Sequence, residues 1–174
     1  MISSIKSRMQ TKQLTPEVFR KVLSQFATGV TVVTAESGPG QVHGMTANSF
    51  TSVSLEPVLI LVCVDQRAKL LSCVMKMHRF GVSVLKESQQ QLSLYFARPE
   101  QSEEENARYG VRYRWLDGVP VLDGTMARFT CLLSAAHPAG DHTILVGEVE
   151  SAEMESSRPL IFYNRQYRGI APEE

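Results

Sequence analysis

The 174-residue chain, 43% of it hydrophobic, is long enough for one well-packed domain and short for two. Its 18 basic residues balance 18 acidic ones, and the net charge of zero gives no electrostatic case for binding nucleic acid or an anionic membrane surface. No apolar run approaches membrane-spanning length, and residues 1–12 hold no hydrophobic signal-peptide core. The cysteines, Cys63, Cys73 and Cys131, lack the CxxC spacing of zinc or redox sites. We therefore expect a soluble cytoplasmic protein with buried, reduced thiols and no metal site.

The N-terminal part of the sequence predicts a flexible segment followed by a helix. Residues 1–14 are mostly polar and charged, so we assign them as a flexible segment ahead of one domain over residues 15–174. Thr15 suits the N-cap position and Pro16 the first helical position. Apolar residues then recur at helical spacing to about Phe26, and we expect the face that they form to pack on a sheet.

Strands and one further helix are predicted in the next part of the chain. The β-branched run 29–35, a turn at SGPG and residues 41–45 predict a hairpin. Residues 58–64 form a continuous apolar run, which is typical of a strand buried on both faces. Residues 67–77 have helical spacing, and Asp65 is the predicted N-cap of this helix.

The rest of the chain is rich in strands. We predict a strand at 80–85, a helix at 87–96, an exposed polar stretch at 97–110 and a loop with a turn at 112–120. Further strands are expected at 125–134, 143–150, 160–163 and 167–170. Strands dominate, with no regular βαβ alternation and no GxGxxG motif. The sequence therefore favours a mainly β protein with flanking helices, built as a closed or split antiparallel barrel, over a Rossmann sheet.

Residues 42–57, VHGMTANSFTSVSLEP, lie between two predicted strands and resemble neither a solvated loop nor a core strand. Small hydroxyl and amide side chains dominate this segment, with almost no charge. Such a composition suits a wall along which a flat ligand with polar edges approaches the backbone closely. The alternative is a half-exposed antiparallel strand whose hydroxyl groups face water, and composition alone does not separate the two.

Two other stretches contain residues suited to chemistry. Residues 66–69, QRAK, place two cations and backbone N–H groups at the start of a helix, which is either an anion site or a solvated surface. Gly140-Asp141-His142 combines a tight turn, a carboxylate and a ring suited to proton exchange, but it is also a common hairpin tripeptide. We expect His43 to be structural or exposed. Because the sequence shows no nucleophile with its base and no metal-ligand grouping, we expect any chemistry to come from a cofactor.

Two long motifs give the chain a resemblance to a known family. FATGVTVVTA together with residues 42–57 resembles the signature of the flavin reductase-like, FMN-binding split-barrel family, and AAHPAGDHTILVGEVE resembles its second hallmark. The resemblance extends from about Pro16 to Ile170. It implies a split antiparallel β-barrel of the FMN-binding type and an NAD(P)H:flavin oxidoreductase. Such an enzyme transfers hydride from NADH or NADPH to FMN or FAD and supplies reduced flavin to a separate monooxygenase. Because a split barrel leaves an open flank, we expect a homodimer.

The resemblance also implies roles for individual residues. His142, with Asp141, would act near the nicotinamide or the reactive face of the flavin. Small residues would line the flavin ring and ribityl chain, a cationic segment would hold the phosphate, and C-terminal residues would close the site. The implied cofactor-binding residues are Thr46, Ala47, Asn48, Ser49, Ser54, Leu55, Val64, Arg67, Ala68, Lys69, Phe80, Tyr167 and Arg168. Leu70 and Ser83 depart from the family pattern, which often has a hydroxyl residue and an asparagine there.

Two other functions are compatible with the sequence. A flavin-binding electron carrier or storage protein would share the barrel and turn over little NAD(P)H, although it has no need of the Asp141-His142 cluster. A non-catalytic barrel used for assembly would bind no flavin. The sequence does not distinguish FMN from FAD, or NADH from NADPH, and it does not identify the monooxygenase.

Overall fold

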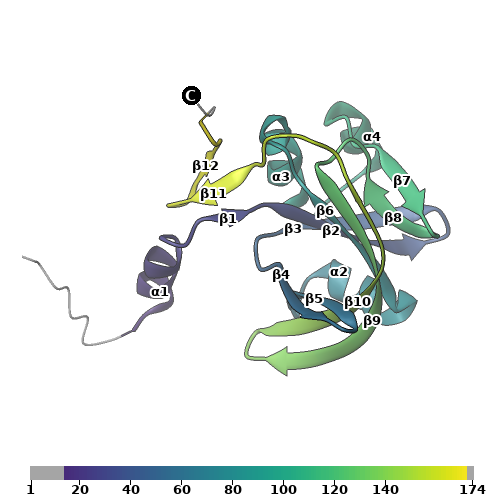
Figure 1. The fold of residues 1–174 in the computed structure, drawn as a ribbon, viewed down its shortest axis with the longest axis horizontal. Coiled ribbons are helices and arrows are strands. Elements are labelled where there is room, and N and C mark those ends of the chain that lie inside the picture. Colours follow the sequence, from purple (N-terminus) through teal and green to yellow (C-terminus); the bar gives the residue numbers. More distant parts are fainter. Residues whose placement is uncertain (1–13, 172–174) are drawn as a thin grey trace, which may run out of the picture.

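The computed structural model describes residues 14–171, in which strands predominate over helices (Figure 1). All of the predicted N-terminal flexible segment except Leu14 lies outside the described residues. The helices are α1 Pro16–Leu23, α2 Lys69–Met77, α3 Gln90–Phe96 and α4 Glu103–Arg108, with a 3₁₀ turn, η1 Glu87–Gln89, before α3. The strands are β1 Thr28–Gly29, β2 Thr31–Gly38, β3 Gln41–Ala47, β4 Thr51–Leu55, β5 Val58–Asp65, β6 Arg79–Val84, β7 Tyr113–Leu116, β8 Val119–Leu122, β9 Ala127–Ala139, β10 His142–Met154, β11 Ile161–Tyr163 and β12 Gln166–Arg168.

The main sheet is antiparallel, with the strand order β3-β2-β6-β9-β10-β5-β4. Its two edge strands, β3 and β4, are consecutive in the chain and are joined only by residues 48–50. Because so short a connection keeps the two edges together, the sheet is rolled into a barrel. Among the described strands, β3 and β4 do not pair with each other, so the barrel is open along the seam between them. The predicted split antiparallel barrel with flanking helices is confirmed.

Apolar side chains from the strands and from α2 fill the barrel. In β5, Ile60, Val62 and Val64 point into this core, whereas the residues between them are only partly buried. The prediction that this strand is buried on both faces is wrong, because only one face of β5 meets the core. Leu70 and Val74 of α2 pack into the same core. Burial of Leu70 gives that position a packing role, which explains an apolar residue there.

A second apolar cluster lies under α3 and the β7–β8 hairpin, and it includes Val32, Tyr95 and Phe96. The predicted loop at 112–120 is this hairpin, which turns at Asp117 and Gly118 with φ of 48° and 78°. Two consecutive residues of positive φ are what a tight two-residue hairpin requires, and Asp-Gly is a preferred sequence for it. The exposed stretch 97–110 contains the short helix α4.

Helix α1 begins as predicted but does not pack as predicted. The Thr15 hydroxyl accepts a hydrogen bond from a backbone N–H in the first turn, and Pro16 is the first helical residue. The helix ends at Leu23, and none of its residues is buried. Phe19 is 52% exposed and Val22 is 66% exposed. The expected packing on the sheet is wrong, because α1 extends away from the barrel (Figure 1).

Helix α2 begins at Lys69, two residues later than predicted, and Asp65 is not its N-cap. The Asp65 carboxylate instead accepts hydrogen bonds from the backbone N–H of Arg67 (2.8 Å) and from its guanidinium Nε (3.1 Å) and Nη2 (2.8 Å). These bonds hold residues 65–67 in a turn, and Ala68 occupies the cap position without a side-chain hydrogen bond. The cationic segment therefore leads into the helix rather than lying within it.

No helix within residues 14–171 is both long enough and apolar enough to cross a membrane. The three cysteines are free thiols; Cys73 and Cys131 are buried, and Cys63 is partly buried. Burial is the main cause that raises the pKa of Cys131 to about 12, so this thiol is protonated at neutral pH.

Candidate functional site

The open seam of the barrel carries the small polar residues that the sequence singled out. Ala47 ends β3 with its side chain in the core, and the chain then crosses to β4. The Ser49 hydroxyl donates to the carbonyl of Cys63 (3.0 Å) and accepts from its N–H (3.1 Å), which fixes the crossing segment on β5. The exposed Asn48 side chain makes no hydrogen bond within residues 14–171 and lines two neighbouring cavities. Its amide is free to bind a ligand at the seam.

A cavity of about 220 Å³ beside Asn48 is lined by β3, α3 and the C-terminal strands. The Thr46 hydroxyl donates to the carbonyl of Ser93 (2.7 Å), and the Ser93 hydroxyl lies 2.8 Å from that of Tyr167. The Tyr167 ring meets Phe162 edge-on, with 5.3 Å between ring centroids. The structure thus brings together three predicted residues, Thr46, Asn48 and Tyr167, within one chain.

A second cavity, of about 510 Å³, lies along the same edge of β3. Arg67, Ala68 and Lys69 line one side of it, and residues 96–99 line the other. The Asp65 carboxylate binds Nε and Nη2 of Arg67, which holds the pKa of Asp65 well below its usual range. Other guanidinium N–H groups stay free, and Lys69 is absent from the ion pairs formed within residues 14–171. This end of the edge is therefore positive.

These cavities follow one another along β3. The two described above share Ala97, and the smaller shares Asn48 and Phe162 with a third cavity of about 420 Å³ beside α1. We call this line of three cavities the β3 groove. Gly44 lines the 510 Å³ cavity, and a Cβ there would stand 2.7 Å from the Phe96 ring. Glycine is therefore what allows α3 to close over the strand and form the groove's outer wall.

The predicted Gly140–His142 turn lies at the tip of the β9–β10 hairpin, against the turn that precedes α2. Gly140 has a φ of +64°, and Gln66 donates to the backbone carbonyls of Asp141 (3.0 Å) and Gly140 (3.2 Å). Nδ1 of His142 is 2.7 Å from Oδ1 of Asp141, and this hydrogen bond is the main cause that lowers the pKa of Asp141. Holding Nδ1 in this way orients the ring and leaves Nε2 as the nitrogen available to a ligand.

Nine predicted residues do not line the groove. Asp141 and His142 lie at the tip of the β9–β10 hairpin, Ala47 points into the core, and Ser49 is bonded to β5. Val64 and Phe80 are wholly buried, so their side chains support the groove from inside the core. Leu55, at the outer edge of the barrel, is 87% exposed. The Ser54 hydroxyl accepts a hydrogen bond from the N–H of Glu56, and the Arg168 side chain forms its one hydrogen bond within the described residues with Gln166 in its own strand.

The sequence interpretation missed Ser93, which lines the groove, and Gln101, which binds the edge of β3 beside it. Ser93 is fully buried and anchors both Thr46 and Tyr167, yet it was seen only as part of a predicted helix. Gln101 donates to the carbonyl of Gly44 (2.7 Å) and accepts from its N–H (3.1 Å), so its amide takes the place of a neighbouring strand. The one sequence feature that could have identified Ser93 is that it is a polar residue on the buried face of a predicted helix. No motif in the sequence distinguishes Gln101.

Residues 23–171 match the flavin reductase like domain family. An NADH-dependent flavin reductase from Rhodococcus is 41% identical over 160 residues, which cover 91% of this chain and 88% of that protein. The reductase component of 4-hydroxyphenylacetate 3-monooxygenase from Thermus thermophilus is 40% identical over 160 residues, or 88% and 96% of the two chains. The NADH:FAD oxidoreductase of Streptomyces globisporus, solved in complex with NAD and FAD fragments, has a TM-score of 0.82 at 34% identity, over 94% of this chain and 99% of its own. With most of its length matched at this level, the chain belongs to the flavin reductase-like domain family.

Proposed function

We propose that this chain is an NADH-dependent flavin reductase that transfers hydride to FMN or FAD and supplies reduced flavin to a separate monooxygenase component. The β3 groove carries this proposal, because it has neutral hydrogen-bonding groups at one end and cations at the other. The relatives of this chain include an NADH-dependent flavin reductase and the reductase component of a monooxygenase.

The groups that line the groove fit a flavin. The free Asn48 amide and the backbone of β3 suit the polar edge of the flavin ring. Arg67, Lys69 and the first N–H groups of α2 suit its phosphate. Neutral donors predominate around the ring position, which is compatible with loose binding and release of the reduced flavin to a partner protein.

When bound, flavin supplies the redox chemistry by accepting hydride from the nicotinamide ring. The Asn48 amide and the backbone N–H groups of β3 orient the ring and stabilise negative charge that develops on its edge. Asp141 fixes Nδ1 of His142, so that Nε2 is presented for hydrogen bonding or proton exchange. Tyr167 lines the cavity beside Asn48 and would cover one side of the ring there.

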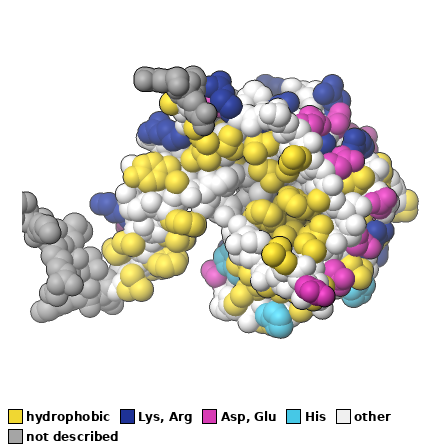
Figure 2. Space-filling model, viewed as in Figure 1, with side chains coloured by type: hydrophobic (Ala, Val, Ile, Leu, Met, Phe, Trp, Pro, Cys, Tyr) yellow, Lys and Arg dark blue, Asp and Glu magenta, His cyan; other side chains and the backbone are white. Residues whose placement is uncertain are grey.

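We also propose that two copies form a homodimer with the flavin sites at their interface. Figure 2 shows hydrophobic side chains along α1 and on the barrel beside the hollow that separates it from α1. Leu23 and Phe26 are 54% and 71% exposed, and both line the cavity that contains Asn48. An apolar surface of this kind marks an interaction site. A second copy would cover it and close the groove next to Asn48.

Aerobic oxidation of NADH and NADPH by the purified protein, with and without added FMN or FAD, tests the enzymatic proposal. We expect oxidation of NADH that depends on added flavin. Flavin binding without oxidation would instead support the electron carrier, and no flavin binding would refute both.

A further inference from the structure

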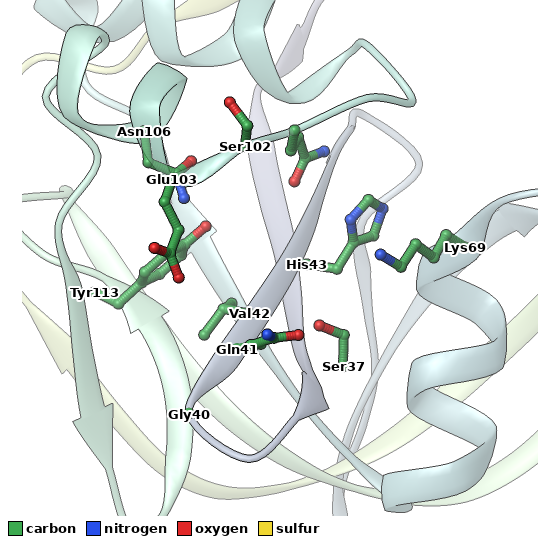
Figure 3. A pocket seen from close by; sticks show the side chains of 11 residues that line it. Ser37, Gly40, Gln41, Val42, His43, Lys69, Ser102, Glu103, Asn106 and Tyr113 are labelled. Atoms are coloured by element: carbon green, nitrogen blue, oxygen red, sulfur yellow. The ribbon is translucent and has the colours of Figure 1, made fainter.

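We propose that the cavity at the hairpin end of β3 is an adenylate subsite, which holds the adenosine monophosphate half of FAD or of NADH. The inference rests on the proposed flavin reductase function. The cavity has a volume of about 430 Å³, within the range of small-molecule sites, and lies between the β2–β3 hairpin and α4 (Figure 3). Lys69 is the one predicted site residue among those that line it.

This cavity continues the β3 groove beyond the cationic segment. His43 and Lys69 line both it and the 510 Å³ cavity of Arg67 and Ala68. In Figure 3 the Lys69 side chain extends toward His43, at the boundary between the two. A mononucleotide ends at its phosphate, whereas a dinucleotide continues with a second phosphate, a ribose and an adenine. If the phosphates of a dinucleotide meet Lys69, its adenylate half leads into this cavity.

The opposite wall offers groups without partners. Glu103 forms no ion pair within residues 14–171, and a carboxylate is the group that commonly binds the two ribose hydroxyls of a dinucleotide. The Tyr113 hydroxyl is buried and has no hydrogen-bond partner within the described residues. Burial raises its pKa, so it is a neutral donor. A buried hydroxyl without a partner is uncommon in a folded protein, and since Tyr113 lines the cavity its O–H is a donor that a bound ligand would satisfy.

Polarity distinguishes the two sides of the cavity. Lys69 supplies positive charge at the entrance, where a phosphate would lie. His43, across the floor from Glu103 and Tyr113, has a pKa of about 4, lowered by burial and then by Lys69, so its ring is neutral at pH 7. A neutral flat ring, a carboxylate and a phenol suit the adenosine beyond the phosphate.

The test uses the double variant Glu103→Gln/Tyr113→Phe, with Glu104→Gln as the matched control, since Glu104 lies on the same helix and does not line the cavity. Dissociation constants for FMN and FAD come from fluorescence titration. Michaelis constants are measured for NADH and for reduced nicotinamide mononucleotide, which lacks the adenylate half. If FAD occupies the subsite, the double variant should bind FAD about 5- to 50-fold more weakly and FMN unchanged.

If NADH occupies the subsite, the Michaelis constant for NADH should rise by a similar factor with either flavin, and that for the mononucleotide should stay constant. Values equal to those of the unmodified protein for both FAD and NADH would overturn the proposal. Saturation-transfer NMR of 5′-AMP with the protein detects binding at the subsite without any turnover. It therefore distinguishes failure of the subsite proposal from failure of the proposed reductase function. An AMP signal that the double variant loses supports the subsite even without turnover, and equal signals overturn it.

Discussion

Substitution of Phe19 by serine should dissociate the proposed homodimer. Phe19 is 52% exposed, and its neighbours on the α1 surface, Val22 and Leu23, are 66% and 54% exposed. Full burial of such a side chain is worth about 1.5–3 kcal/mol, so burial of the exposed part is worth about 1–2 kcal/mol. The change occurs in both copies and should therefore reduce the free energy of dimerisation by about 2–4 kcal/mol. This raises the dissociation constant of the dimer by roughly 30- to 1000-fold.

Size-exclusion chromatography with light scattering over a range of protein concentrations would measure this effect. Met75→Ser is the control, because Met75 is 45% exposed on α2 and the change lowers surface hydrophobicity to a similar degree. We expect the control to dimerise normally and Phe19→Ser to appear as a monomer that is still folded. An unmodified protein that is monomeric at micromolar concentration, or a Phe19→Ser variant that dimerises as tightly as the control, would refute the reasoning.

Three further predictions concern the site. His142→Ala should lower turnover by about 10- to 1000-fold while FMN affinity is largely kept, and turnover equal to that of the unmodified protein would reject the role of this ring. Asn48→Ala should weaken FMN binding by about 3- to 10-fold in a fluorescence titration, and an unchanged dissociation constant would exclude the amide as a contact. The pKa of His43 in the folded protein, about 4, is below its ordinary 6.5, so the unfolded chain binds a proton first as the pH falls. Stability in urea should therefore decline between pH 6.5 and pH 4, by about 1–2 kcal/mol after solvent screening, and His43→Gln should lack this part of the decline.

Local signals in the sequence predicted most of the elements and the main segments of the site. Thr15 and Pro16 mark a helix start through their own geometry, and the two apolar runs around residues 42–57 mark strands. The small residues of the seam and the Gly140–His142 turn were recognised because each lies within a contiguous motif. Such features need no knowledge of the rest of the fold.

What the sequence did not predict depends on partners distant in the chain. The apolar spacing of α1 shows that one face favours burial, but it does not say that the barrel of the same chain leaves this face exposed. Asp is a residue type that often occupies the N-cap, but the carboxylate of Asp65 binds the guanidinium of Arg67 instead. Hydrogen bonds between two charged groups are stronger than a hydrogen bond to an uncharged backbone N–H. Ser93 joins the site only because α3 packs across β3, which no local pattern encodes.

The open seam explains why we place the flavin site along β3. An edge strand presents unpaired N–H and C=O groups, which a closed barrel would use in its own ladder. The Gln101 side chain binds the N–H and C=O of Gly44 on the unpaired side of β3. Because the backbone of a strand repeats every two residues, the N–H and C=O of Thr46 point to the same unpaired side. No described strand pairs with them, and the side chain of Thr46 is held back by Ser93, which keeps the approach clear. The backbone groups that a closed barrel would use in a β3–β4 ladder are thereby left free for the polar edge of the proposed flavin. Loss of the Gln101 amide would free the groups of Gly44 as well, and should alter flavin affinity without any direct change to the seam.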